Sequence, residues 1–129
     1  MINSQVFDYV NVLDKAADAS WLRNDAIANN IANVDTPDYK RQDVDFESAL
    51  KTALQSANGS SMDSRVSSMD LNKLNVSTYT DNGDFSYRLD GNNVDIDTEN
   101  AELASNQLKY EAIMQSVNQE FANLNRVMK

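Results

Sequence analysis

Residues 29–40 read Asn-Asn-Ile-Ala-Asn-Val-Asp-Thr-Pro-Asp-Tyr-Lys, and this stretch marks the point at which a long N-terminal helix has to end. Pro37 lacks a backbone N–H and disfavours the α conformation at Thr36, so a helix does not continue through these two residues. The turn over residues 33–40 therefore has two interpretations, a simple helix stop or part of a functional motif. The turn by itself does not choose between them.

Upstream of this turn, residues 3–33 carry a seam of side chains spaced alternately by four and three residues. This pattern is typical of a coiled-coil helix, here with two polar positions at Ser20 and Asn24. The seam consists of Val6, Val10, Leu13, Ala17, Ser20, Asn24, Ile27, Ile31 and Val34. A second stripe of smaller side chains runs through Val12, Ala16, Ala19 and Ala26. Two stripes predict more than one neighbour for this helix.

A second long helix is predicted over residues 97–128, where the same alternating spacing recurs. Its seam consists of Leu103, Gln107, Tyr110, Met114, Val117, Phe121, Leu124 and Met128, and its second stripe of Ala101, Ala104, Leu108 and Ala112. The predicted fold is mainly α, with the N- and C-terminal helices paired as an antiparallel coiled-coil-like hairpin. The side chains expected to carry this packing are Val6, Val10, Leu13, Ile27, Ile31, Leu103, Tyr110, Met114, Val117, Phe121 and Leu124.

Between the helices of segments 1–34 and 94–129 lies a polar middle that cannot build a core of its own. Residues 35–55 are predicted as a turn and a short helix, and residues 56–75, rich in Ser, Asn and Asp, as a flexible loop. Residues 76–93 are predicted as a small β-hairpin, since Asn82-Gly83 is a turn signal and Phe85, Tyr87 and Leu89 alternate with polar residues.

Composition excludes several classes of function. The 129 residues allow one domain, and the net charge of −9 argues against nucleic acid and against anionic lipid as partners. The chain has neither Cys nor His, so it lacks thiolate metal ligands and the usual general base. The first residues show no cleaved secretory signal, and no apolar run is long enough to span a bilayer.

Two acidic runs could in principle carry chemistry. Residues 90–99 hold oxygen ligands that suit calcium, but their spacing does not match an EF-hand loop, and a turn followed by a helix start explains them better. Asp43, Asp45 and Glu47 lack a partner catalytic residue, so a solvated helix start is the simpler explanation. We therefore expect no enzyme, no cofactor and no metal site.

Apolar ridges at both ends of the chain, with no catalytic chemistry between them, predict a subunit of an assembly. One helix pair buries too little apolar surface to offset the entropy of ordering it, so we expect the ends to order fully only against neighbouring subunits. The alternatives are a soluble helical bundle and a soluble cytoplasmic helical adaptor or chaperone-like protein.

The turn and a second run carry a resemblance to a known family. The residues Asn30, Ile31, Ala32, Asn33, Thr36, Pro37, Tyr39 and Lys40 resemble the N-terminal signature of bacterial flagellar rod and hook proteins. The segment Gly91-Asn92-Asn93-Val94-Asp95-Ile96-Asp97 and the residues after it are similar to the C-terminal helix of the family's short proximal rod subunit. The family usually has Gly where this chain has Asp38, so we expect a type I turn there or a strained one.

The resemblance implies a structural subunit of the proximal rod of the flagellar basal body, which transmits torque, forms part of the export channel wall and is required for motility. It implies export through the flagellar type III apparatus without a cleaved signal peptide, and a location in the periplasmic rod. The implied partners are other copies of the chain, other rod subunits, the rod–MS-ring junction protein and the export apparatus. Phe46 and Leu50 resemble an export signal of this class, although an ordinary apolar pair explains them equally well.

Overall fold

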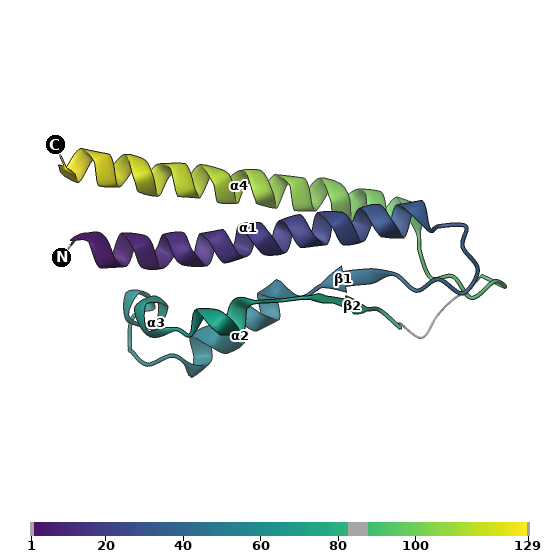
Figure 1. Cartoon of the computed structure of the whole chain (residues 1–129), viewed down its shortest axis with the longest axis horizontal. Coiled ribbons are helices and arrows are strands. Elements are labelled where there is room, and N and C mark those ends of the chain that lie inside the picture. Colours follow the sequence, from purple (N-terminus) through teal and green to yellow (C-terminus); the bar gives the residue numbers. More distant parts are fainter. Residues whose placement is uncertain (1, 83–87, 129) are drawn as a thin grey trace.

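The computed structural model describes residues 2–82 and 88–128, and of residues 2–6 the backbone only. The elements are α1 (Ile2–Ala32), β1 (Gln42–Val44), α2 (Phe46–Ser56), α3 (Met62–Ser68), a short 3-10 helix η1 (Leu71–Leu74), β2 (Thr78–Thr80) and α4 (Ile96–Met128). In Figure 1, α1 and α4 run side by side along the long axis with both chain termini at one end. The predicted antiparallel pairing of the two terminal helices is confirmed.

The middle segment forms a layer along the side of α1 that faces away from α4 (Figure 1). Its core cluster joins Ala19 of α1 to five buried side chains of the middle segment, which are Val44, Phe46, Ala53, Met69 and Leu74. The small-residue stripe of α1 is thus the surface that the middle covers, with Ala19 and Ala26 both buried. Small side chains allow the neighbouring backbone to approach closely, and Ala19 of α1 shares one core cluster with the middle segment.

Residues 56–75, predicted as a flexible loop, contain α3 and η1. Val66, Met69 and Leu74 are buried, and this burial gives the segment its order. The Ser61 side chain accepts a hydrogen bond from Ser64 N at 3.2 Å, which caps α3. Asp70 does the same for η1. Residues whose composition is typical of a linker are therefore partly helix caps.

The small sheet is antiparallel and pairs Gln42 with Thr80 and Val44 with Thr78. Its strands are distant in sequence, so β2 pairs with β1 across α2, α3 and η1. The hairpin predicted over residues 76–93 places its second strand at residues 85–89. Residues 83–87 lie outside the described residues, and Leu89 is exposed and belongs to no strand.

The seam between the two long helices differs from the predicted one on α4. Asn106 is buried in place of Gln107, which is exposed, and Phe121 is 44% exposed although it was predicted to pack. Glu99 is also buried, and it lies four residues before Leu103 on the same face. The second stripe of α4 is exposed at each of its four residues. The register of α4 is therefore set by its polar contacts with α1 and with Arg41 as well as by its apolar pattern.

The other predicted packing residues lie as follows. Ile27 is buried, and Val10, Leu13, Ile31, Leu103, Tyr110, Met114, Val117 and Leu124 are half-buried. The side chain of Val6 lies outside the described part of the chain. Within residues 2–82 and 88–128, no helix combines the length and the apolar character needed to cross a bilayer.

Candidate functional site

The densest set of polar contacts lies where α1 ends and α4 begins, at the end of the molecule opposite the chain termini (Figure 1). We call this region the turn junction and define it as residues 30–41 together with residues 88–99. It brings together the two runs that carry the family resemblance. Each run hydrogen-bonds the other through both backbone and side chains, as in Asn93 N to Tyr39 O at 3.3 Å and Arg41 N to Asn93 Oδ1 at 2.7 Å.

Asn30 is fully buried at the centre of the turn junction, and all four of its hydrogen-bonding positions are used. Its Nδ2 donates to Gln42 O at 2.8 Å and to Glu99 Oε2 at 3.1 Å. Its Oδ1 accepts from Gln42 N at 2.8 Å and from the Tyr39 hydroxyl at 3.1 Å. One amide thus holds α1, β1 and α4 together, and no other residue type supplies two donors and two acceptors at this length.

Asn92 closes the end of α1 from another part of the chain. Its Nδ2 lies 2.9 Å from Asn33 O, 3.0 Å from Val34 O and 2.8 Å from Thr36 O, while its Oδ1 accepts from Val94 N at 2.7 Å. These three carbonyls belong to the turn that follows Ala32, the last residue of α1. The buried Asn92 amide holds this turn and fixes the direction in which the chain leaves α1.

Asp38 and Gly91 fit against each other where the two turns cross. The turn over residues 36–39 is closed by a hydrogen bond from Tyr39 N to Thr36 O at 3.3 Å. Asp38 has φ of 60°, which excludes the type I turn and leaves the strained turn that the sequence offered as the alternative. Gly91 has φ of 79°, and a Cβ added there would lie 2.3 Å from Asp38 Oδ1. Asp38 N donates to Asp90 O at 2.7 Å, and Lys40 Nζ donates to Gly91 O. Glycine is favoured at position 91 because this φ is strained for other residues, and a Cβ there would also displace the Asp38 carboxylate.

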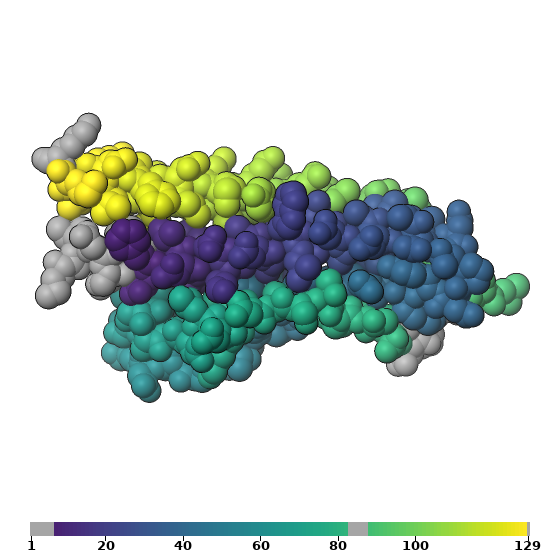
Figure 2. Space-filling model, in the orientation of Figure 1, coloured from purple at the N-terminus to yellow at the C-terminus, as the bar shows by residue number. Residues whose placement is uncertain are grey.

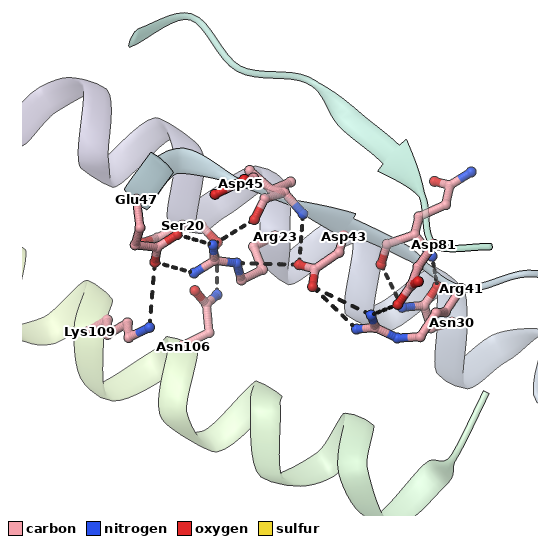
Figure 3. Close-up of polar contacts among 12 residues, drawn as sticks. Ser20, Arg23, Asn30, Arg41, Asp43, Asp45, Glu47, Asp81, Asn106 and Lys109 are labelled. Atoms are coloured by element: carbon pink, nitrogen blue, oxygen red, sulfur yellow. Dashed lines mark hydrogen bonds and ion pairs between the residues drawn. The ribbon is translucent and has the colours of Figure 1, made fainter. Parts of the chain in front are cut away.

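Arg41 neutralises the buried Glu99, and Figure 3 shows Arg41 with two further acidic partners, Asp43 and Asp81. Arg41 Nε lies 2.7 Å from Glu99 Oε1, and Arg41 Nη1 lies 2.8 Å from Asp81 Oδ2. Burial lowers the pKa of Arg41, but its hydrogen bonds to Glu99 and Asp81 outweigh that effect and raise the pKa. Burial and the Glu99 carboxylate also raise the pKa of Tyr39. The guanidinium thus stays charged and removes the cost of a lone buried carboxylate.

A second polar cluster joins α1, the middle segment and α4 farther along the helices (Figure 3). Arg23 of α1 binds both carboxylate oxygens of Glu47, at 3.0 and 2.7 Å, and donates to Val44 O at 2.6 Å. Lys109 of α4 lies 3.5 Å from Glu47. The hydrogen bonds from Arg23 lower the pKa of Glu47 to about 2. A two-point contact of this kind fixes the orientation of both groups.

The remaining motif residues lie around these contacts. Asn33 donates to Asn29 O at 2.8 Å and accepts from the Thr36 hydroxyl at 3.1 Å. Ala32, Thr36 and Pro37 are exposed, and Ile31 and Lys40 are half-buried. Sequence reasoning did not single out Arg41, Asn92, Glu99 or Asn106 as contact residues. Extending the α4 seam four residues back from Leu103 would have found Glu99.

The candidate export pair is packed in the core, and residues of both acidic runs accept hydrogen bonds from backbone N–H groups. Phe46 is buried in the core cluster and Leu50 packs against it. Asp45 caps α2 by accepting from Ser48 N at 3.1 Å, and Asp95 accepts from Asp97 N at 3.1 Å. Among the described residues, no group of three or more acidic side chains is arranged to hold a metal ion. The hydrogen bonds and ion pairs described above hold α1, α4 and the middle segment in fixed relative positions.

The sequence of the chain is similar to that of one known family. Residues 15–40, which span the end of α1 and the turn, match a family described as flagella basal body rod protein. The chain is 36% identical to the flagellar basal body rod protein FlgB of Bacillus subtilis, over 90% of this chain and 89% of that protein. It is 35% identical to FlgB of Borrelia hermsii over 93% and 95% of the two chains, and 29% identical to FlgB of Escherichia coli over 83% of each.

Proposed function

The chain belongs to the FlgB family of flagellar basal body rod proteins, a structural and non-enzymatic family, and from that premise we propose that it builds the proximal rod, transmits torque and forms part of the export channel wall. The observation that carries the proposal is identity of 36% that extends over 90% of the chain, and so includes both terminal helices and the middle layer.

The fold supports a mechanical role. Torque passes through a subunit only if its elements keep their relative positions under load. The Asn30 and Arg23 clusters join α1, the middle layer and α4 by hydrogen bonds and ion pairs, which resist sliding of one helix along the other better than apolar contacts alone. The exposed second stripe of α4, residues 101, 104, 108 and 112, remains available for lateral contact with neighbouring subunits.

Location, partners and export route follow the same premise. We place the subunit in the periplasmic rod of the basal body, with further copies of itself, other rod subunits and the rod–MS-ring junction protein as neighbours. Delivery by the flagellar type III apparatus needs an unfolded chain. If Phe46 and Leu50 are an export signal, it is read before folding, because Phe46 is buried afterwards.

Two substitutions in the helix seam test the proposal. Leu13→Asp and Val117→Asp each place a carboxylate between α1 and α4, where both side chains are half-buried. We expect normal cellular protein levels, no incorporation into basal bodies and no swimming, because a charge in the seam separates the helices. Asn11→Asp and Gln115→Asp, at exposed positions of the same helices, serve as controls and should assemble.

A seam variant that still gave a working rod would overturn the mechanical proposal. Fractionation of the unmodified protein addresses the alternative of a soluble adaptor. A lasting cytoplasmic pool, with none of the chain in purified basal bodies, would favour the adaptor.

A further inference from the structure

A groove of about 420 Å³ opens between α1 and α4, outside the turn junction. Trp21 of α1 borders it on one side, and Tyr110 and Glu111 of α4 border it on the other. The Trp21 side chain is 63% exposed, so its indole lies at the rim. Asn106 lines the groove from within and is only 3% exposed.

Asn106 holds an unused hydrogen-bond acceptor. Its Nδ2 donates to Ser20 O at 2.8 Å, a contact visible in Figure 3, whereas its buried Oδ1 has no hydrogen-bond partner among the described residues. A buried amide oxygen without a partner is uncommon and destabilising in folded proteins. Since Asn106 lines the groove, its oxygen can accept a hydrogen bond from a donor that reaches the floor of the groove.

The groove is suited to a cation. Glu111 is exposed and has no ion pair within the described part of the chain. An amide oxygen, a carboxylate and the face of an indole together match a guanidinium group, which donates several N–H bonds and stacks on aromatic rings. Glu111 would repel an anionic ligand, and a purely apolar ligand would leave the Asn106 oxygen without a donor.

The chain carries a matching element in the last turn of α4. Arg126 is exposed and has no ion pair among the described residues, and it is followed by Val127 and Met128, which are 52% and 70% exposed. A basic group beside two exposed apolar side chains complements an acidic groove with an indole at its rim. Arg126 cannot reach the groove of its own molecule, because Asn106 and Arg126 are separated by roughly 30 Å along one continuous helix.

We propose that this groove binds the last turn of α4 from a second copy of the chain, with the Arg126 guanidinium between Asn106 Oδ1 and Glu111, and with Val127 and Met128 against Trp21. The inference rests on the proposed role as a rod subunit and names one contact between copies. Because the groove and the inserted turn are different surfaces, the contact is heterologous and can continue from copy to copy.

Charge reversal tests the pairing in cells. Glu111→Arg and Arg126→Glu should each lower incorporation into basal bodies by at least about tenfold, since each brings like charges together. The double variant restores an opposite-charge pair and should recover most of the loss. Ser116→Arg, which adds the same charge at an exposed position on another face of α4, is the matched control. Circular dichroism of each purified variant verifies that helix content is unchanged.

Disulfide cross-linking tests the contact itself, and the natural absence of cysteine leaves only the introduced thiols. A chain with Gln107→Cys and Val127→Cys should give a ladder of dimers and larger products on mild oxidation of basal bodies, since each copy then carries both surfaces. Replacing Gln107→Cys by Asn118→Cys, also exposed on α4, should abolish the ladder.

The outcomes separate the two proposals. Incorporated protein without a ladder and without double-variant rescue overturns the groove contact and leaves the rod function standing. Cross-links from position 107 to a different rod protein overturn the choice of a second copy. Absence of the unmodified chain from basal bodies overturns the rod function and the groove contact together.

Discussion

Replacing Asn30 should destabilise the turn junction more than any other single truncation of its size in α1. Asn30→Ala removes four hydrogen bonds of 2.8 to 3.1 Å at a fully buried position. The four groups that lose this partner are Gln42 N, Gln42 O, Glu99 Oε2 and the Tyr39 hydroxyl. At about 1 kcal/mol net for each bond, and with a few tenths returned by the better helix propensity of Ala, we expect the free energy of unfolding to fall by about 3 kcal/mol.

The neighbouring Asn29 provides a control of the same chemistry. Asn29 is exposed, and its side chain makes no hydrogen bond among the described residues. Asn29→Ala should therefore leave the free energy of unfolding unchanged or raise it by up to about 0.6 kcal/mol, the propensity difference between the two residues. The comparison isolates burial and hydrogen bonding from residue type.

Urea unfolding followed by far-ultraviolet circular dichroism gives the global comparison. Trp21 is a poor reporter for it, since the indole is exposed in the folded chain. Hydrogen exchange gives the local comparison. The Gln42 amide loses its bond to Asn30 Oδ1 and should therefore exchange faster in Asn30→Ala only. A difference below about 1 kcal/mol between the two variants, with Gln42 protection unaltered, would refute the central role assigned to Asn30.

Two further outcomes concern acid sensitivity and the crossing of the two turns. Because Arg23 lowers the pKa of Glu47 from 4.5 to about 2, the Glu47 contact stabilises the fold fully above pH 4.5 and is lost as the pH falls from 4.5 towards 2. Glu47→Gln should flatten that part of the stability–pH curve measured by urea unfolding, and an unchanged curve would show that Glu47 does not titrate there. Gly91→Ala should lower the free energy of unfolding by about 2 kcal/mol, since its Cβ meets Asp38 Oδ1 and its φ of 79° suits glycine. The loss should shrink in an Asp38→Gly background, and equal losses in both backgrounds would remove Asp38 from the explanation.

Local signals in the sequence were sufficient for the long helices and their end. Pro37 prevents α1 from continuing through Thr36, because its missing N–H and its steric clash act within a few residues, and α1 ends at Ala32. The apolar periodicity also identified two paired helices, since a stripe repeats with the helical turn and needs no knowledge of its partner. The family motif was also recognisable, because it is one short run of the sequence. Its hydrogen-bonded partners lie far away in the chain and were not recognisable.

The tertiary structure alone decided which surfaces are covered. The second stripes of α1 and α4 have similar sequence patterns. The stripe of α1 packs on the middle layer, whereas the stripe of α4 is exposed. The same holds for the seam, where the buried Glu99 and Asn106 depend on Arg41 and Ser20, both far away in the chain. Periodicity is a property of one segment, but burial and polar pairing are properties of two, and the second segment is known only once the chain has folded.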